Sequence, residues 1–427
     1  MFRKLIYRLY ENYRNPSLKA DFHFLIESDR WSLPQLQNYQ ISACRELLFF
    51  AAAYSPYYKQ QFQKSGFSPE TFHSLEDLKK LPITDKKTLT EHNKQLQAVY
   101  PFKKTIYSKT SGSTGEILSF YRDEAWESFH LASIFRGLSW YGISRWDKSA
   151  VLSGSDPGQK TQLKIQILDF IRNQFRLSSY NKRTTDKFIG HLNKAVSIQG
   201  YSSMIYELAC MCNRKNNSSF PKLKLVKGTS DMIFDSYREE IKKAFGKPII
   251  SEYGAAETGI IAFECPEGNM HINMEGVIIE ESDGEIIVTN LHSRSFPIIR
   301  YRLGDYIRLA PEGYKCPCGR QHPVLLELQG RVGGVICGKT NRFPSVILNF
   351  AFKEIMSKYN RIFSYQGIQK EKSRLTIRIA EAENPGDREI IKRVFEHYLK
   401  DDVILEILFS QDLRPTQGKR NYFISEI

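Results

Sequence analysis

The stretch Tyr107–Leu118, YSKTSGSTGEIL, concentrates hydroxyl side chains and glycines. Its core consists of six consecutive residues, Thr110, Ser111, Gly112, Ser113, Thr114 and Gly115. Glycines let the backbone approach a ligand closely with its N–H groups exposed, and serine and threonine add hydroxyl donors, so this loop could surround phosphate oxygens. Taken alone, the same composition also fits a flexible turn.

Four further segments follow in a fixed order along the chain. They are Ser251–Gly259 (SEYGAAETG), Arg300–Asp305 (RYRLGD), Gly330–Arg331, and Pro415–Arg420 (PTQGKR). Together with the Ser/Thr/Gly loop, they resemble the signature motifs of the adenylate-forming superfamily. LEDLKKLPITDKKTL and YGAAETGIIAFECPEGNMHIN resemble the phenylacetate-CoA ligase-like group in particular, and its CapK-type branch of capsular polysaccharide synthesis. The resemblance extends from about Ser32 to the end of the chain.

The resemblance implies a role for each matching residue. It implies that Tyr253 stacks on the adenine of ATP, with Gly254 in the same nucleotide-binding turn, and that Glu257 holds Mg²⁺ against the phosphates, as a hard cation prefers. A carboxylate at Asp305 can accept both ribose hydroxyls. The resemblance also implies that Thr114 and its neighbours bind the phosphates and that Arg331 lies beside the ribose and phosphate. It implies that Lys419 bridges the substrate carboxylate and the α-phosphate.

A second group of residues could bind a metal. Cys265, His271, Cys316 and Cys318 provide three thiolates and one imidazole, the closed donor set of structural zinc. Their C-x5-H and C-x-C spacings depart from the commoner C-x2-C, so ordinary thiols remain the alternative, and His322 is a substitute ligand.

The pattern of elements indicates an α/β protein. At 427 residues the chain exceeds the size of one ordinary core. We expect helices over 32–54 and 56–66, a helix on each side of the Leu81-Pro82 turn, and strands flanking DSYREEIKKAFG. Beyond Gly276 we expect β structure: a hairpin turning at Asp283-Gly284, and a pair of short strands in PIIRYRLGDYIRLA. GRVGGVICGK is the best linker candidate, and the region after it is expected to alternate helix, strand, helix and strand.

With the resemblance, this pattern predicts two domains. Residues 1–330 would form a large adenylate-forming domain of several subdomains, one of them β, and residues 331–427 a small mobile α/β lid. Gly333-Gly334 stands where the family usually has acidic residues, which puts the transfer to CoA in more doubt than adenylation.

Charge and cysteine usage constrain the partners. The net charge of +14 favours polyanionic partners, but the basic residues are dispersed and no nucleic-acid module is recognised, so a nucleic-acid-binding zinc protein is disfavoured.

Seven cysteines in this pattern indicate a reduced compartment, hence the cytoplasm. No apolar run is long enough to span a membrane. The basic, apolar Met1–Tyr13 segment fits contact with anionic lipid at the inner face of a membrane.

The sequence therefore predicts an ATP- and Mg²⁺-dependent, AMP-forming ligase. It would convert a small carboxylic acid to an acyl-adenylate and transfer the acyl group to a thiol such as CoA or to an amine. The alternative within the same chemistry is an enzyme of surface-polysaccharide assembly that transfers to an amine or sugar without CoA. A further alternative is an inactive relative of these enzymes. The presence of Glu257, Asp305 and Lys419 argues against it. The sequence predicts no oligomeric state.

Overall fold

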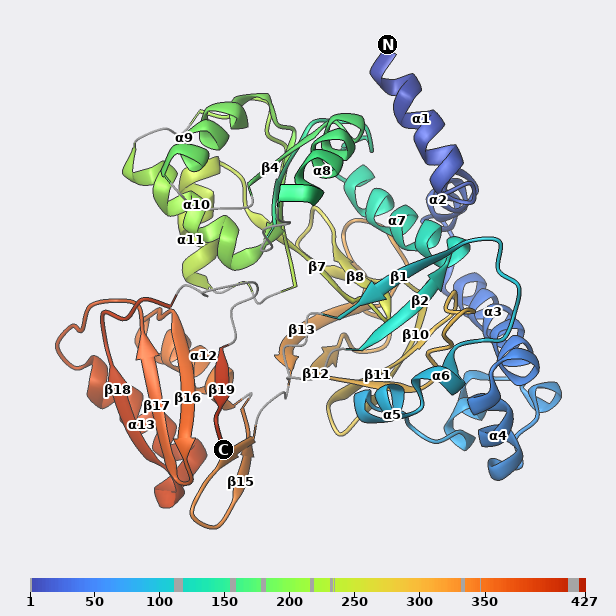
Figure 1. Ribbon diagram of the computed structural model, residues 1–427. Helices are drawn as coiled ribbons and strands as arrows, with labels where there is room; N and C mark the ends of the chain where they lie inside the picture. The colour runs from blue at the N-terminus through green and yellow to red at the C-terminus, as the bar shows by residue number, and fades with distance from the viewer. Residues whose placement is uncertain are drawn as a thin grey trace.

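The computed structural model describes residues 2–110, 118–153, 159–177, 182–215, 219–230, 233, 235–331, 335–345, 347–413 and 422–427. The chain has the expected mixed α/β fold, with a large N-terminal part and a smaller C-terminal part (Figure 1). No described helix has the length and apolarity needed to cross a bilayer.

A central sheet organises the large part. Among the described residues it has eleven strands in the order β10-β11-β12-β13-β9-β8-β7-β6-β5-β3-β4. The parallel half contains β3 (Ser149–Leu152), β4 (Gln174–Leu177), β5 (Ser197–Tyr201), β6 (Leu225–Thr229) and β7 (Ile249–Ala255). The antiparallel half contains β8 (Gly259–Glu264), β9 (Met270–Ile272), β10 (Val277–Ser282), β11 (Glu285–Asn290), β12 (Tyr301–Leu309) and β13 (Val324–Arg331). The β structure expected after Gly276 therefore continues the same sheet.

Helices cover the parallel half because its strands are apolar and must be buried on both faces. They are α7 (Glu124–Ser139), α8 (Gln159–Ile171), α9 (Lys182–His191), the 3₁₀ turn η3 (Leu192–Lys194), α10 (Ser202–Arg214) and α11 (Asp235–Phe245). One core joins Ile198 and Val226 of the strands to Leu208 of α10 and Ile241 of α11. The predicted order of strand, helix and strand around DSYREEIKKAFG is confirmed by β6, α11 and β7.

A helical layer packs against the antiparallel half. Its elements are α3 (Leu33–Tyr54), α4 (Pro56–Ser65), η1 (Pro69–Thr71), η2 (Leu75–Lys80), α5 (Lys86–Glu91), α6 (Asn93–Leu96) and the hairpin of β1 (Thr105–Lys109) and β2 (Ser119–Asp123). Two further helices, α1 (Phe2–Arg14) and α2 (Leu18–Ser28), precede them. The predicted start of α3 is confirmed, since Gln35 Oε1 accepts the Ser32 N–H at 2.9 Å. Gly66 ends α4 at φ 64°, a left-handed conformation that suits glycine.

The antiparallel strands confirm one turn and correct one prediction. Ser282 pairs with Glu285, and Asp283 and Gly284 have φ of 55° and 79°, as a two-residue hairpin requires. The prediction of two short strands in PIIRYRLGDYIRLA was wrong, because β12 runs continuously through it. Gly304, at φ 83°, lies between Arg302 and Tyr306, where the register of β12 with β11 shifts, so the irregularity lies within one continuous strand.

The C-terminal part has its own sheet and core. Its elements are the hairpin of β14 (Val335–Cys337) and β15 (Arg342–Pro344), then α12 (Ile347–Tyr359), β16 (Tyr365–Glu371), β17 (Arg374–Ile379), α13 (Asp387–Leu399), η4 (Lys400–Asp402), β18 (Ile404–Leu408) and β19 (Phe423–Ser425). The sheet has the order β18-β17-β16-β19, and the buried apolar cluster beneath it begins at Ile336. The predicted α12, β17, α13 and β18 are confirmed, whereas β16 was not predicted.

Candidate active site and metal centre

Tyr253 lies where the central sheet changes from parallel to antiparallel. β7 is the last parallel strand, and it pairs antiparallel with β8. Ligands of open α/β sheets bind outside the carboxyl ends of the parallel strands, and Tyr253 lies near the carboxyl end of β7. The Tyr253 ring is almost completely buried in this position. The sequence motif therefore falls at the point of the fold where a nucleotide crevice is expected.

The side chain of Asp305 meets Tyr253 across the sheet. Tyr253 Oη donates a hydrogen bond to Asp305 Oδ2 at 2.7 Å, and Asp305 is only 6% exposed. β7 and β12 are separated by three strands, so a flat sheet would hold them about 19 Å apart. The antiparallel half must therefore curl back toward β7. This curl brings together two residues that lie 52 positions apart in the chain.

Glu257 is held in the turn between β7 and β8. Its carboxylate is buried, Oε1 accepts a hydrogen bond from Tyr301 Oη at 3.1 Å, and its backbone carbonyl accepts one from Asn290 Nδ2 at 3.3 Å. Gly254 is required here, since a Cβ would lie 2.2 Å from the Gly259 carbonyl oxygen. Tyr301 was not singled out from the sequence, although it lies inside the RYRLGD motif.

The second carboxylate oxygen of Glu257 fits a cation. Oε2 is buried and has no hydrogen-bond partner among the described residues. Burying an anionic oxygen without a hydrogen-bond donor costs free energy. A cation or a donor bound at Oε2 would remove this cost. Oxygen ligands of this type are those that Mg²⁺ prefers.

Several predicted site residues are only partly described or lie outside the described residues. Ser111, Gly112, Ser113, Thr114 and Gly115 lie outside them, as do Gly333, Gly334 and Lys419. The ends of the Ser/Thr/Gly loop are nevertheless fixed, because Thr110 and Leu118 exchange hydrogen bonds: Thr110 N–H donates to the Leu118 carbonyl at 2.9 Å, and Leu118 N–H donates to Thr110 Oγ1 at 3.1 Å. The backbone of Arg331 pairs with Asp305 on the neighbouring strand.

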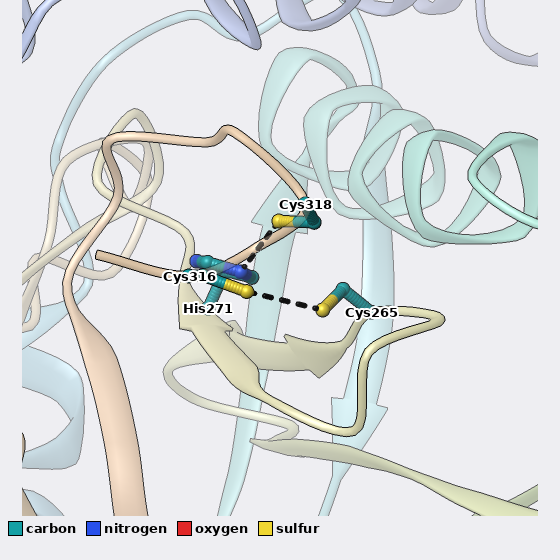
Figure 2. A group of neighbouring side chains, drawn as sticks. All are labelled: Cys265, His271, Cys316 and Cys318. Carbon is teal, nitrogen blue, oxygen red and sulfur yellow. Dashed lines mark hydrogen bonds between the residues drawn. The ribbon is translucent and has the colours of Figure 1, made fainter.

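The three cysteines and the histidine of the predicted metal set come together (Figure 2). Their ligand atoms all lie within 4.8 Å of one another. Cys265 follows β8, His271 lies on β9, and Cys316 and Cys318 lie in the loop between β12 and β13. Cys265 Sγ and Cys316 Sγ are 3.7 Å apart, close to the roughly 3.8 Å that two thiolates show on a tetrahedral zinc. The set therefore has the dimensions of a zinc site.

Hydrogen bonding and burial prepare these side chains for a metal. His271 Nδ1 contacts the His322 carbonyl oxygen at 2.9 Å, so it carries the proton, and Nε2, 3.1 Å from Cys318 Sγ, keeps its lone pair. Burial lowers the pKa of His271 to about 4 and raises the pKa of Cys265 to about 12. Burial also acts to raise the pKa of Cys318, but hydrogen bonds from the Arg320 backbone and from Cys316 outweigh it and lower this pKa. A neutral imidazole is ready to bind, and a divalent cation would stabilise the thiolates.

His322, the alternative ligand, belongs to a different group. His322 Nε2 donates to Glu275 Oε1 at 3.0 Å, Arg136 Nη1 donates to the same oxygen at 2.8 Å, and Ser28 Oγ also donates to it. Burial acts to raise the pKa of Glu275, but Arg136 and His322 outweigh it and hold this pKa well below its usual range. This cluster could not be predicted from the sequence, because Arg136 and Glu275 are 139 positions apart.

This cluster predicts a measurable loss of stability for Ser28→Ala. The variant should be destabilised by about 1.5–3 kcal/mol in chemical unfolding, the usual contribution of a hydrogen bond to a charged group. Ser65→Ala is the matched control, because Ser65 is exposed and its hydroxyl donates only to carbonyls of its own helix. Equal midpoints for the two variants would show that the hydroxyl of Ser28 does not support Glu275.

Comparisons with known proteins agree with this geometry. No protein-family model matches the chain. CapK of Staphylococcus aureus is 24% identical over 292 residues, covering 65% of this chain and 63% of CapK. Phenylacetate-coenzyme A ligase of Thermus thermophilus is 22% identical over 424 residues, covering 87% of this chain and 86% of that ligase. The crystal structure of 2-hydroxyisobutyryl-CoA ligase in the postadenylation state, in complex with 2-HIB-AMP, has a TM-score of 0.73 at 17% identity, covering 93% of this chain and 90% of that one.

The chain resembles the adenylate-forming superfamily in sequence and in fold. The resemblance to its phenylacetate-CoA ligase-like group and CapK-type branch is confirmed by these relatives, and the structural likeness confirms the adenylate-forming fold. The alignment with CapK spans just under two thirds of that protein.

Proposed function

We propose that the chain is an ATP-dependent, AMP-forming ligase that activates a carboxylic acid as its acyl-adenylate. The observation that carries this proposal is the hydrogen bond from Tyr253 to Asp305, which come from separate strands of the sheet, together with the buried carboxylate of Glu257 in the turn after β7. An aromatic ring, a carboxylate oxygen that has no partner among the described residues, and a carboxylate that accepts hydroxyls suit adenine, Mg²⁺ and ribose respectively. The relatives in the same superfamily support this function.

The reaction is an in-line displacement at the α-phosphorus of ATP. A substrate carboxylate oxygen attacks this atom, the bond to the bridging oxygen breaks, and pyrophosphate leaves. Tyr253 and Asp305 bind the nucleoside, the Ser/Thr/Gly loop with Thr114 binds the phosphates, and Arg331 supports the ribose. Lys419 offsets the negative charge that accumulates between carboxylate and α-phosphate. Mg²⁺, held by Glu257, would neutralise the phosphate oxygens.

The acyl-adenylate is a mixed anhydride, so a thiol or an amine can attack its acyl carbon and release AMP. The relationship to phenylacetate-CoA ligases supports CoA as the acceptor, and the relationship to CapK supports an amine or sugar of surface polysaccharide as the second candidate. Measuring the acyl product with and without CoA tests this choice. Turnover only with CoA supports the first candidate, and equal acyl transfer to an amine in its absence supports the second.

We propose that the boundary between the adenylate-forming domain and the lid lies at Gly330, with residues 331–427 forming a mobile lid. Its support is the separate core that begins at Ile336. None of the seven cysteines, all of which the structure describes, forms a disulfide, and this supports a cytoplasmic location.

We also propose that Cys265, His271, Cys316 and Cys318 hold a structural zinc. The ion would tie the β8-β9 hairpin to the loop between β12 and β13, a link between residues 51 positions apart. Three thiolates and an imidazole fill a tetrahedral shell, so this site leaves no position for a substrate.

The purified protein is expected to contain about one equivalent of zinc, because the donor set is complete. Cys316→Ser should lower the unfolding temperature and the metal content together, while the fraction that remains folded keeps its adenylation rate. Cys44→Ser is the control, since Cys44 is equally buried but lies in an apolar core away from the cluster. Metal-free protein of undiminished stability would contradict the proposal.

A further inference from the structure

Two neighbouring helices turn apolar side chains toward solvent at one edge of the molecule. On α1, Leu5 and Leu9 are 56% and 61% exposed, and on α8, Leu163 and Ile167 are 67% and 54% exposed. A spacing of four residues places each pair on one side of its helix. The two helices contact each other, and α1 lies at the edge of the large part, away from the C-terminal sheet (Figure 1). We call Leu5, Leu9, Leu163 and Ile167 the apolar patch.

Helix α1, which carries Leu5 and Leu9, is held in place because its opposite side packs against the protein. Tyr7 and Glu11 are buried against the protein, and Glu11 pairs with Arg145 at 3.4 Å. The packed side thus fixes the outward direction of Leu5 and Leu9. An anchored helix with a second, exposed apolar side differs from the ordinary surface helix, which has only one apolar stripe.

The exposed charges that α1 and α8 carry among the described side chains have one sign. Glu11 and Asp169 are the only acidic residues of α1 and α8, and both are buried, Asp169 against Arg176 at 3.1 Å. By contrast, Lys4, Arg8 and Lys164 are exposed. Lys4 Nζ and the Arg8 guanidinium lie 4.9 Å and 5.9 Å from the centre of the Trp146 ring, which holds both cations at the edge of α1. The exposed surface is therefore apolar and cationic.

We propose that the apolar patch and its cations dock on an anionic lipid bilayer. Amphipathic helices of this composition lie in the interface, with leucines below the headgroups and basic residues against anionic lipid. A second copy of the chain is a poorer occupant, because it would bring the same cations face to face. The proposal concerns a surface outside the nucleotide site, so it stands or falls independently of the proposed enzymatic function.

Flotation of the full-length protein with lipid vesicles tests the proposal. The protein should bind vesicles in which phosphatidylglycerol replaces about a third of the phosphatidylcholine, and bind pure phosphatidylcholine at least about tenfold more weakly. Added salt should weaken the binding, because cations near an anionic surface are screened. The absence of binding, or equal binding to both vesicles, would overturn the proposal.

Two double variants separate the apolar and the cationic contributions. Leu5→Glu/Leu9→Glu should reduce binding to the anionic vesicles at least about tenfold. Lys4→Gln/Arg8→Gln should reduce it roughly 25-fold, since each cation near such a surface contributes about fivefold. Val99→Glu is the matched control, because Val99 is 72% exposed outside these helices, and it should bind like the parent.

The variant residues are exposed, so circular dichroism and unfolding temperature should match the parent. Undiminished vesicle binding by Leu5→Glu/Leu9→Glu would overturn the proposal. The proposal would also be overturned if the parent did not bind vesicles and was a dimer that Leu5→Glu/Leu9→Glu converted to a monomer. A second copy of the chain would then cover the apolar patch.

Discussion

Replacement of Lys419 by alanine is expected to slow acyl-adenylate formation by roughly 10² to 10³-fold, the scale found when one preorganised charge-stabilising group is removed. From its resemblance to the superfamily motif, we expect this lysine to bridge the carboxylate and the α-phosphate only while the lid is closed for adenylation. In the superfamily the lid adopts a second pose for transfer, so the lysine should be dispensable there. Given ready-made acyl-adenylate, the Lys419→Ala variant should therefore complete transfer at nearly the parent rate.

Measuring the two half-reactions separately decides the role of Lys419. Lys372→Ala is the matched control, because Lys372 is an exposed lysine in the turn between β16 and β17, and it should change neither half-reaction. Equal losses in both half-reactions for Lys419→Ala would assign the lysine to the fold or the lid. Full activity in both would remove it from the site.

Glu257→Gln is expected to slow adenylate formation by about 10²-fold at Mg²⁺ concentrations that saturate the parent, because the metal loses an anionic ligand. The buried Oε2 has no hydrogen-bond partner among the described residues, which is why we expect this carboxylate to bind Mg²⁺ in the proposed nucleotide site. A neutral amide still offers an oxygen, so higher Mg²⁺ should recover part of the rate. The measurement is the Mg²⁺ dependence of pyrophosphate exchange.

Two controls distinguish loss of the metal ligand from general damage to the site. Tyr301→Phe removes the hydrogen bond to Glu257 Oε1 but keeps the carboxylate, so it should leave the Mg²⁺ requirement close to that of the parent. Asp305→Ala should raise the KM for ATP instead, because it removes an acceptor of the ribose hydroxyls. If Glu257→Gln had the Mg²⁺ dependence of the parent, the metal would be held by other residues.

Elements whose ends depend on local chemistry could be predicted from the sequence. Ser32 with Gln35 begins α3, Gly66 ends α4, and Asp283 with Gly284 turns the β10-β11 hairpin, each through backbone conformation or hydrogen bonds within a few residues. The four members of the Cys/His cluster could also be named, because thiol and imidazole chemistry marks them individually.

Elements that depend on distant partners could not be predicted. Strand β16 contains Gln366 and Gln369, which read as solvent-exposed. In the structure Gln369 is fully buried, because its amide bonds both to the N–H and to the carbonyl of Cys337. The cluster around Glu275 likewise needs α2, α7 and the loop before β13, and its members carry no pattern in the sequence.

The candidate nucleotide site falls between these two cases. The motifs identified Tyr253, Glu257 and Asp305 as a set, but only the curl of the antiparallel half brings Asp305 to Tyr253. The contact of Tyr301 with Glu257 could not be predicted, because it depends on the direction in which the Tyr301 side chain points. Spacing along the sequence does not report that direction.

Pyrophosphate exchange into ATP, measured across aryl, fatty, amino and uronic acids, tests the central claim most directly. Formation of an acyl-adenylate is reversible, so labelled pyrophosphate should enter ATP only when the right class of acid is present, and the net products should be AMP and pyrophosphate. The same exchange should fail in the Lys419→Ala variant. Acid-dependent consumption of ATP that yields ADP and orthophosphate, with no pyrophosphate exchange, would contradict the assignment of this chain as an AMP-forming ligase.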